Sequence, residues 1–348
     1  MEPVDIDPLG DVLICCGTGI GTNEKKFIRV SSTVLGGVSS VFKAKFQEPE
    51  FTEAYKRPDL YPSGWVGLAL WEVDSKAMEI MCEVLHHRHT RVPESAEGQE
   101  ELVANVAELC DKYDCIDALL PTARGWLAPI RGTEHTTARR HLMTAAYYFR
   151  DDKAFYMYGH WLLRNAYDAI DRPAIWSPEL DAANHVLRVV FGLLEAERNW
   201  AIQAITNACS RFVAGRSWAH YTWPICAENC VTTEQANVIA MGELFGFYQD
   251  PAFTTPIATM LDAMRRFPDR CEPCLAGDCD EYAQCRHQNT KTDYLCTQAE
   301  GIEKSLKVPC VVCLKERQPY WGMCEHHDDQ IGRNEHDEHD GEDQEDED

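Results

Sequence analysis

Basic residues are scarce in this sequence. Its 348 residues include 33 lysines and arginines against 57 aspartates and glutamates, which gives a formal net charge of −24 at neutral pH. Binding to a phosphate backbone requires a basic face on the protein. The charge balance therefore argues against a nucleic-acid partner.

Long apolar runs and targeting signals are also missing. No stretch reaches the roughly 18 apolar residues that a membrane span needs, so we expect no membrane partner. The opening MEPVDIDPLGDV lacks the basic and apolar regions of a secretory signal, and no N-x-[ST] acceptor occurs. These absences predict an intracellular protein, cytoplasmic or nuclear. In a reducing compartment its 16 cysteines bind metal more often than they form disulfides.

Catalytic signatures do not stand out either. We find no Ser/His/Asp order, carboxylate pair, phosphate-binding loop or open metal site, so the sequence predicts a protein that is not an enzyme. Gly17, Gly19 and Gly21 are the nearest approach to a phosphate-cradling loop. Because neither G-K-[ST] nor a helix follows them, closure of a β-hairpin is the favoured interpretation.

The stretch 25–46, KKFIRVSSTVLGGVSSVFKAKF, organises the first part of the chain. It begins with the period-2 alternation of a short strand, after which apolar residues recur at helical spacing. Gly36 and Gly37 divide the helical run into a short turn of helix and a longer one. With further strands predicted at 11–16 and 65–73, the sequence indicates a small sheet combined with helices.

The same stretch resembles the start of a BTB/POZ domain, in which a hairpin leads into helices. Ser31 stands where that family often has a histidine. Residues 75–88 and VAELCDKY at 106–113 resemble the helices that follow in the domain, so the resemblance covers residues 9–130. The matching residues of the first stretch are Val30, Val34, Leu35, Ser39, Phe42 and Phe46.

Within the BTB family, the chain resembles the fungal proteins most. Their DKYDC segment and the tryptophan after it match residues 111–115 and Trp126, and their helical extension resembles residues 145–163. The resemblance implies an α+β fold. We expect a BTB/POZ domain over residues 1–132, with a small sheet and helical hairpins, and an all-α domain over residues 133–265.

BTB domains are protein–protein interaction modules, so the resemblance implies a non-enzymatic adaptor. Two kinds of partner are implied: a second copy of the chain, giving a homodimer, and the cullin scaffold of a ubiquitin ligase, for which the chain would be a substrate receptor. The alternative is a transcription or chromatin regulator that uses a zinc-type segment near the end of the chain.

Cysteine is the informative residue in that segment, which we place at residues 266–328. The spacing C-x2-C-x10-C-x2-H in residues 310–327 offers four ligands suited to tetrahedral zinc, and no position stays open for a substrate. A second C-x-x-C, at 271–274, pairs either with the cysteines at 226 and 230 or with those at 279 and 285. The sequence thus predicts structural zinc. The predicted ligands are Cys226, Cys230, Cys271, Cys274, Cys310, Cys313, Cys324 and His327.

Two further clusters have an ordinary and a functional interpretation. His86, His87 and His89 end a predicted helix; a polar helix end is favoured over a metal site, because no second ligand cluster lies nearby. Residues 329–348 are almost entirely acidic or polar. We predict a disordered acidic tail, with an acidic peptide for a basic partner as the alternative.

Overall fold

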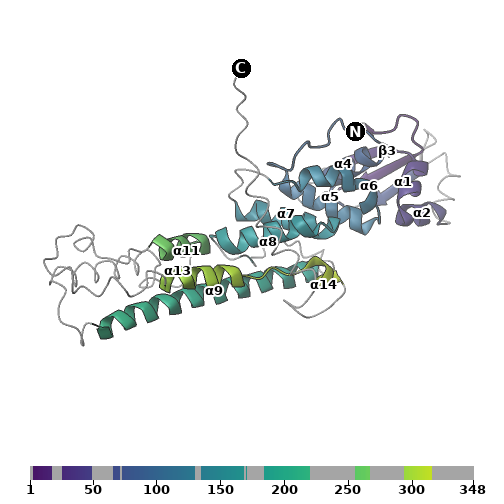
Figure 1. Ribbon diagram of the computed structural model, residues 1–348. Coiled ribbons are helices and arrows are strands. Elements are labelled where there is room, and N and C mark those ends of the chain that lie inside the picture. The colour runs from purple at the N-terminus through teal and green to yellow at the C-terminus, as the bar shows by residue number, and fades with distance from the viewer. Residues whose placement is uncertain are drawn as a thin grey trace, which may run out of the picture. The chain divides into compact units, whose positions relative to one another are not determined.

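The computed structural model describes residues 3–17, 26–48, 66–70, 73–129, 135–167, 170, 184–219, 255–266 and 294–315. These residues form a mixed, mostly helical structure with one small sheet (Figure 1), which confirms the predicted α+β class at this level. They fall into two compact units, divided between Tyr158 and Gly159. No helix of the described part is long and apolar enough to cross a membrane.

The sheet of the first unit has four strands in the order β1-β3-β2-β4. β2 (Val12–Cys16) pairs antiparallel with β3 (Lys26–Val30), as the predicted hairpin requires, and parallel with β4 (Val66–Leu70). The short β1 (Val4–Asp5) adds to the free edge of β3 in parallel. Buried and half-buried residues alternate along β2, so only one face of the sheet packs into the core.

Two short helices follow the hairpin, and the break between them differs from the prediction. α1 (Ser32–Val38) contains both Gly36 and Gly37, and α2 (Ser40–Gln47) begins after Ser39. Ser39 adopts an extended backbone, and its hydroxyl accepts a hydrogen bond from the amide of Phe42 at 3.0 Å. A side-chain cap of this kind starts a new helix, which explains why the chain breaks at the serine rather than at the glycines.

Four longer helices complete the core of the first unit: α4 (Ser75–Leu85), α5 (Glu100–Lys112), α6 (Ile116–Trp126) and α7 (Thr136–Phe149). Asp74 caps α4 by accepting from the amide of Ala77 at 2.7 Å; the residues before the apolar run leave Asp74 and Ser75 as alternatives. α7 packs along α5 inside the first unit. The first compact unit thus continues past residue 132, to Tyr158, and the predicted domain boundaries stay a prediction.

Three helix ends of the first unit share one geometry. His87, Asp114 and Arg150 have φ values of 55°, 51° and 60°, in the left-handed region. In each case the next amide bonds back to a carbonyl five residues earlier: Arg88 to Glu83, Cys115 to Cys110, and Asp151 to Ala146. This is the Schellman ending, which usually has glycine at the left-handed position.

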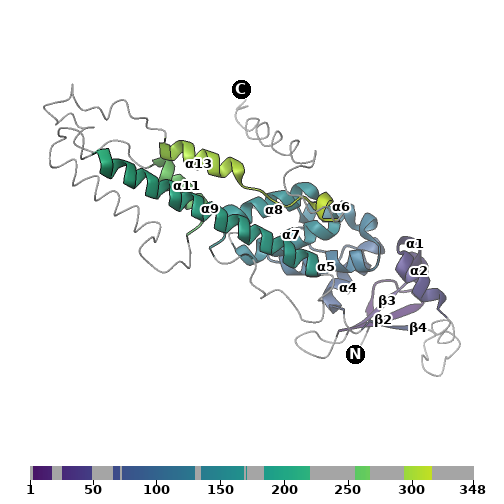
Figure 2. The ribbon, with the colours of Figure 1, turned by 90° about the horizontal axis from the view of Figure 1, so that it is seen from below.

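The second unit contains the long helix α9 (Asn184–Ala219), with α11 (Ile257–Arg266) and α13 (Tyr294–Ser305) packed on it (Figure 2). α9 is one continuous helix of 36 residues. α8 (Asp152–Asn165) spans the division between the units, and the short α14 (Val311–Lys315) follows α13. Glu303 forms ion pairs with Arg164, at 2.8 Å, and with Arg265.

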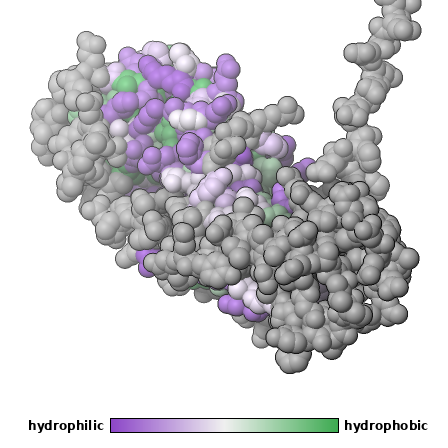
Figure 3. Space-filling model, turned by 90° about the vertical axis from the view of Figure 1, so that its left-hand side faces the viewer, coloured by the Kyte–Doolittle hydropathy of each residue, from purple (hydrophilic) through white to green (hydrophobic). Residues whose placement is uncertain are grey.

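The described surface is mostly hydrophilic on the side shown in Figure 3, where hydrophobic residues form only small, separate patches. Scattered single apolar side chains are normal on a protein surface. An interaction surface on that side would therefore depend on a few apolar anchors among polar groups.

Candidate functional site

Two glutamates lie on the buried face of α4. The side chains of Glu79 and Glu83 are only 5% and 3% exposed. Their spacing of four residues places them one turn apart on the same face of the helix. Because a buried carboxylate is costly unless it is paired and hydrogen-bonded, the partners of these two groups define what they do.

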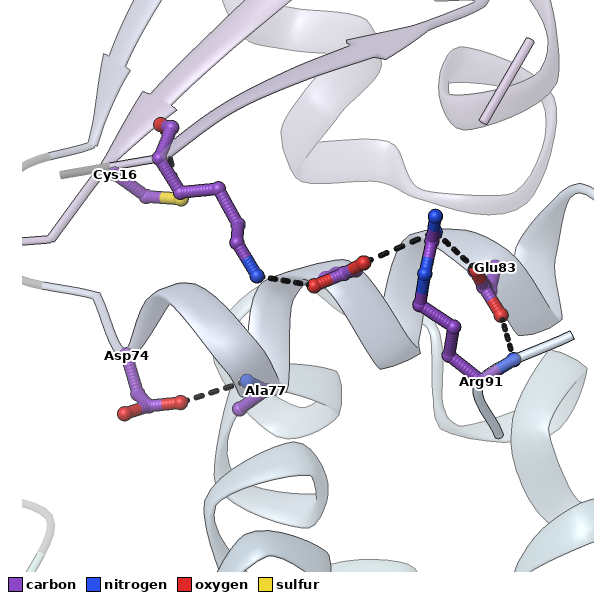
Figure 4. Close-up of polar contacts among 7 residues, drawn as sticks. Cys16, Asp74, Ala77, Glu83 and Arg91 are labelled. Carbon is purple, nitrogen blue, oxygen red and sulfur yellow. Dashed lines mark hydrogen bonds and ion pairs between the residues drawn. The ribbon is translucent and has the colours of Figure 1, made fainter. Parts of the chain in front are cut away.

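Figure 4 shows those partners. Lys26, on β3, forms an ion pair with Oε2 of Glu79. One guanidinium nitrogen of Arg91 lies 3.0 Å from Oε1 of Glu79 and 2.8 Å from Oε1 of Glu83. The main-chain amide of Arg91 donates to Oε2 of Glu83 at 2.8 Å. The four side chains thus balance two negative charges with two positive ones.

Every carboxylate oxygen in this network has a partner. Neither glutamate therefore presents an open oxygen that would act as a general base on a substrate. The arrangement instead ties β3, α4 and the segment after α4 together. This network was not predicted, although two glutamates spaced four apart inside an apolar helix are a sequence signal that would have marked it.

The histidine cluster after α4 behaves as a helix end. Nδ1 of His86 lies 2.8 Å from the carbonyl of Cys82, and Nε2 accepts a hydrogen bond from the amide of Ser31 at 3.0 Å. Both ring nitrogens are thus used on main-chain groups, which leaves none for a metal ion. Burial lowers the pKa of His86, which favours the neutral ring that these two bonds require.

Four of the five described cysteines of the first unit are core residues rather than reactive thiols. Cys16, Cys82, Cys110 and Cys115 are all buried, and the sulfurs of Cys82 and Cys115 contact those of Met78 and Met81 at 3.7 and 3.8 Å. Burial raises the pKa of Cys16 to about 12 and the pKa values of Cys82 and Cys110 well above their usual value. The thiolate, which is the reactive form, is therefore suppressed.

Only two of the predicted zinc ligands lie within the described residues. Cys310 directly precedes α14 and Cys313 is the third residue of that helix; both are buried. Cys226, Cys230, Cys271, Cys274, Cys324 and His327 lie outside the described residues. Within the described ranges, no three metal-ligating side chains gather into a group.

Exposed apolar side chains flank α1 in the first unit. Leu9 is 91% exposed in the turn between β1 and β2, and Val38, the last residue of α1, is 38% exposed. Asp11 fixes the turn to α1, since its carboxylate accepts from the amide of Ser32 at 2.8 Å and from its hydroxyl at 2.6 Å. The turn that carries Leu9 is thus tied, two residues later, to the start of α1, and the Leu9 side chain is exposed.

The chain was compared with protein-family models, with curated proteins and with solved structures. None of the three comparisons finds a match. The proposed function therefore depends on the chain's own residues and on the family resemblance of its first part.

Proposed function

We propose that the chain is a non-enzymatic protein–protein interaction adaptor whose first unit is a BTB/POZ-like docking platform. The observation that carries this proposal is the order and pairing of its elements. An antiparallel hairpin, β2 and β3, leads into the helix pair α1 and α2; β4 then pairs parallel with β2, and α4, α5 and α6 follow. This is the order that the BTB resemblance implies for a small sheet with helical hairpins.

The state of the reactive groups supports an adaptor over an enzyme. The buried carboxylates of Glu79 and Glu83 are neutralised by Lys26 and Arg91. His86 has both ring nitrogens bonded to the main chain, and the core thiols have raised pKa values. These groups maintain the shape of the first unit.

The surface around α1 is the part of the platform that we propose for docking, with Leu9 and Val38 as its apolar anchors. Two partners fit the proposal: a second copy of the chain, and a cullin scaffold that the chain would join as a substrate receptor. An exposed leucine adds binding free energy when a partner covers it, by about 25 cal/mol for each Å² of apolar surface removed from water.

Light scattering of the full chain, alone and with a purified cullin amino-terminal domain, tests the proposal. We expect either a dimer mass or a complex with the cullin domain. The double variant Leu9→Asp/Val38→Asp is expected to lose that association. Its matched control is Ala118→Asp/Ala128→Asp, which adds the same two charges at exposed positions in and just after α6. A chain that stays monomeric at all concentrations and binds no cullin would contradict the proposal.

Structural zinc near the end of the chain is a separate part of the proposal. Buried thiols at Cys310 and Cys313, three residues apart, supply donors of the kind that zinc takes in tetrahedral sites. We expect the double variant Cys310→Ser/Cys313→Ser to carry less zinc per chain by elemental analysis than Cys15→Ser/Cys296→Ser. Equal zinc content in the two variants would remove Cys310 and Cys313 from the ligand set. The alternative function, transcription or chromatin regulation, depends mainly on residues outside the described ranges and stays a prediction.

A further inference from the structure

α9 carries a long exposed face without charge. Between positions 189 and 210 its exposed residues are Val189, Gly192, Ala196, Asn199, Trp200, Gln203, Asn207 and Ser210. About a quarter of the residues of the whole chain are charged, so eight successive exposed positions on one helix without a charged residue are unusual here. Loss of charge together with an exposed tryptophan is typical of the centre of a protein interface.

The charged residues of this stretch all bond to main-chain groups of other segments of the second unit. Glu195 accepts a hydrogen bond from the amide of Ile170 at 2.7 Å, and Arg198 donates to the carbonyl of Ala166 at 3.3 Å. Glu197 accepts from the amide of Lys307 at 3.1 Å. The outer face of α9 is therefore left to apolar, small and amide side chains.

An apolar row runs through this face, and we call Val189, Gly192, Ala196 and Trp200 the α9 stripe. Val189 is 43% and Trp200 48% exposed. Nothing lies within 4 Å of the position that a Cβ on Gly192 would take, so the glycine leaves an open space on the helix surface. A large side chain and an open space thus lie two turns apart, on either side of Ala196.

We infer that the α9 stripe is a contact between two copies of this chain, related by a two-fold axis at Ala196. Residues spaced by four form ridges, and two helices most often cross at about −50° when such ridges interdigitate. In an antiparallel crossing centred on Ala196, Trp200 of each copy lies over Gly192 of the other. A row with a large side chain at one end and an open space at the other is thus self-complementary, as a two-fold interface requires.

Charge and size are consistent with a second copy. In this crossing Arg188 lies opposite position 204, an alanine, so no like charges meet across the axis. From Gly192 to Trp200 the stripe spans about 12 Å of helix, at about 1.5 Å per residue. It buries less than the roughly 1,200 Å² of a standard interface, so we expect the contact to be weak by itself and to add to another one. The inference thus extends the self-association proposed above to a second surface.

Paired variants of the full chain test this register by sedimentation equilibrium. Trp200→Lys removes the large residue and Gly192→Glu fills the space with a charge, so each variant is expected to self-associate at least about tenfold more weakly than the wild type. In an equimolar mixture, one Trp200–Gly192 contact survives and the new lysine meets the new glutamate. We therefore expect the mixture to recover to within about threefold of the wild-type affinity.

The controls separate this inference from the proposed function. Ser210→Lys adds the same charge on the exposed face of α9, away from the row, and should leave association unchanged. Circular dichroism checks that each variant folds. A mixture no tighter than its components would overturn the register, and an unchanged Trp200→Lys would overturn the α9 stripe as a self-contact. Leu9→Asp/Val38→Asp acts on the first unit only, so its result tests the docking platform independently.

Discussion

Removal of Arg91 is the sharpest perturbation of the first unit. Its guanidinium lies 3.0 Å from Glu79 and 2.8 Å from Glu83, and its amide bonds to Glu83. Arg91→Ala keeps the amide bond and the Lys26–Glu79 pair but takes away the cation that the two buried carboxylates share. Glu83 is then left without a charged partner.

The size of the effect follows from burial. Loss of one partner from a fully buried ion pair costs about 3–5 kcal/mol. The Arg91 side chain is 52% exposed, so water already screens part of its interaction with the glutamates. Because Glu83 also keeps its bond to the amide of residue 91, we expect about 2 kcal/mol, which corresponds to a roughly 30-fold larger population of the locally opened state.

Hydrogen exchange measured by mass spectrometry reports this opening directly. Peptides covering 75–91 should lose protection in Arg91→Ala, while Arg88→Ala, an exposed neighbour, should behave like the wild type. In Arg91→Ala/Glu83→Gln the unpaired charge is gone, so part of the protection should return. We expect a coupling of about 1 kcal/mol between the two sites.

Two results would refute this reasoning. If Arg91→Ala exchanges like the wild type, the charged network does not hold α4 to the segment that follows it. If the double variant is as unprotected as the sum of its two single variants, the cost comes from lost packing rather than from an unpaired carboxylate.

Three further predictions concern the stability of the first unit. Burial lowers the pKa of His86, so the unfolded chain binds a proton that the folded chain does not, and stability should be lost as the pH falls from about 6.5 through that lowered pKa. The melting temperature of His86→Gln should therefore fall less in acid than that of the wild type or of the exposed control His89→Gln. Equal slopes of melting temperature against pH for all three would contradict this. Among the described cysteines of the first unit, Cys15 should react first with a maleimide, while Cys82 and Cys110 should react only after unfolding, as peptide mapping can check. Early labelling of Cys82 and Cys110 would argue against a closed core. Arg150→Gly should raise the free energy of unfolding by about 0.5–1 kcal/mol, because glycine adopts the left-handed conformation without steric strain. In the same denaturant titration, Arg124→Gly, inside α6, should lower it by a similar amount. Destabilisation by both variants would mean that Arg150 is not strained by its positive φ.

Local signals in the sequence predict much of the first unit. A short apolar run marks β2, alternation marks β3, and Asp74 or Ser75 before an apolar run marks the start of α4, because strand formation and capping depend on neighbouring residues. The break between α1 and α2 was placed at Gly36 and Gly37 instead of Ser39. Glycine is only permissive for a break, while the Ser39 hydroxyl actively caps the next helix.

Features that depend on distant residues were not predictable in the same way. Lys26 and Glu79 are 53 positions apart, and nothing local indicates that they meet. The packing of α7 on α5, which extends the first unit past residue 132, likewise depends on contacts between separate segments of the chain. Of the predicted zinc ligands, only Cys310 and Cys313 lie within the described residues. The spacing of all the predicted ligands in the sequence therefore remains the main argument for the metal.

The dissociation constant of the complex formed by the full chain tests the docking platform most directly. Leu9→Asp/Val38→Asp should bind a second copy of the chain, or the cullin domain, at least about tenfold more weakly than Ala118→Asp/Ala128→Asp, at an unchanged melting temperature. Equal constants for the two variants would contradict the claim that the surface around α1 is where the first unit docks.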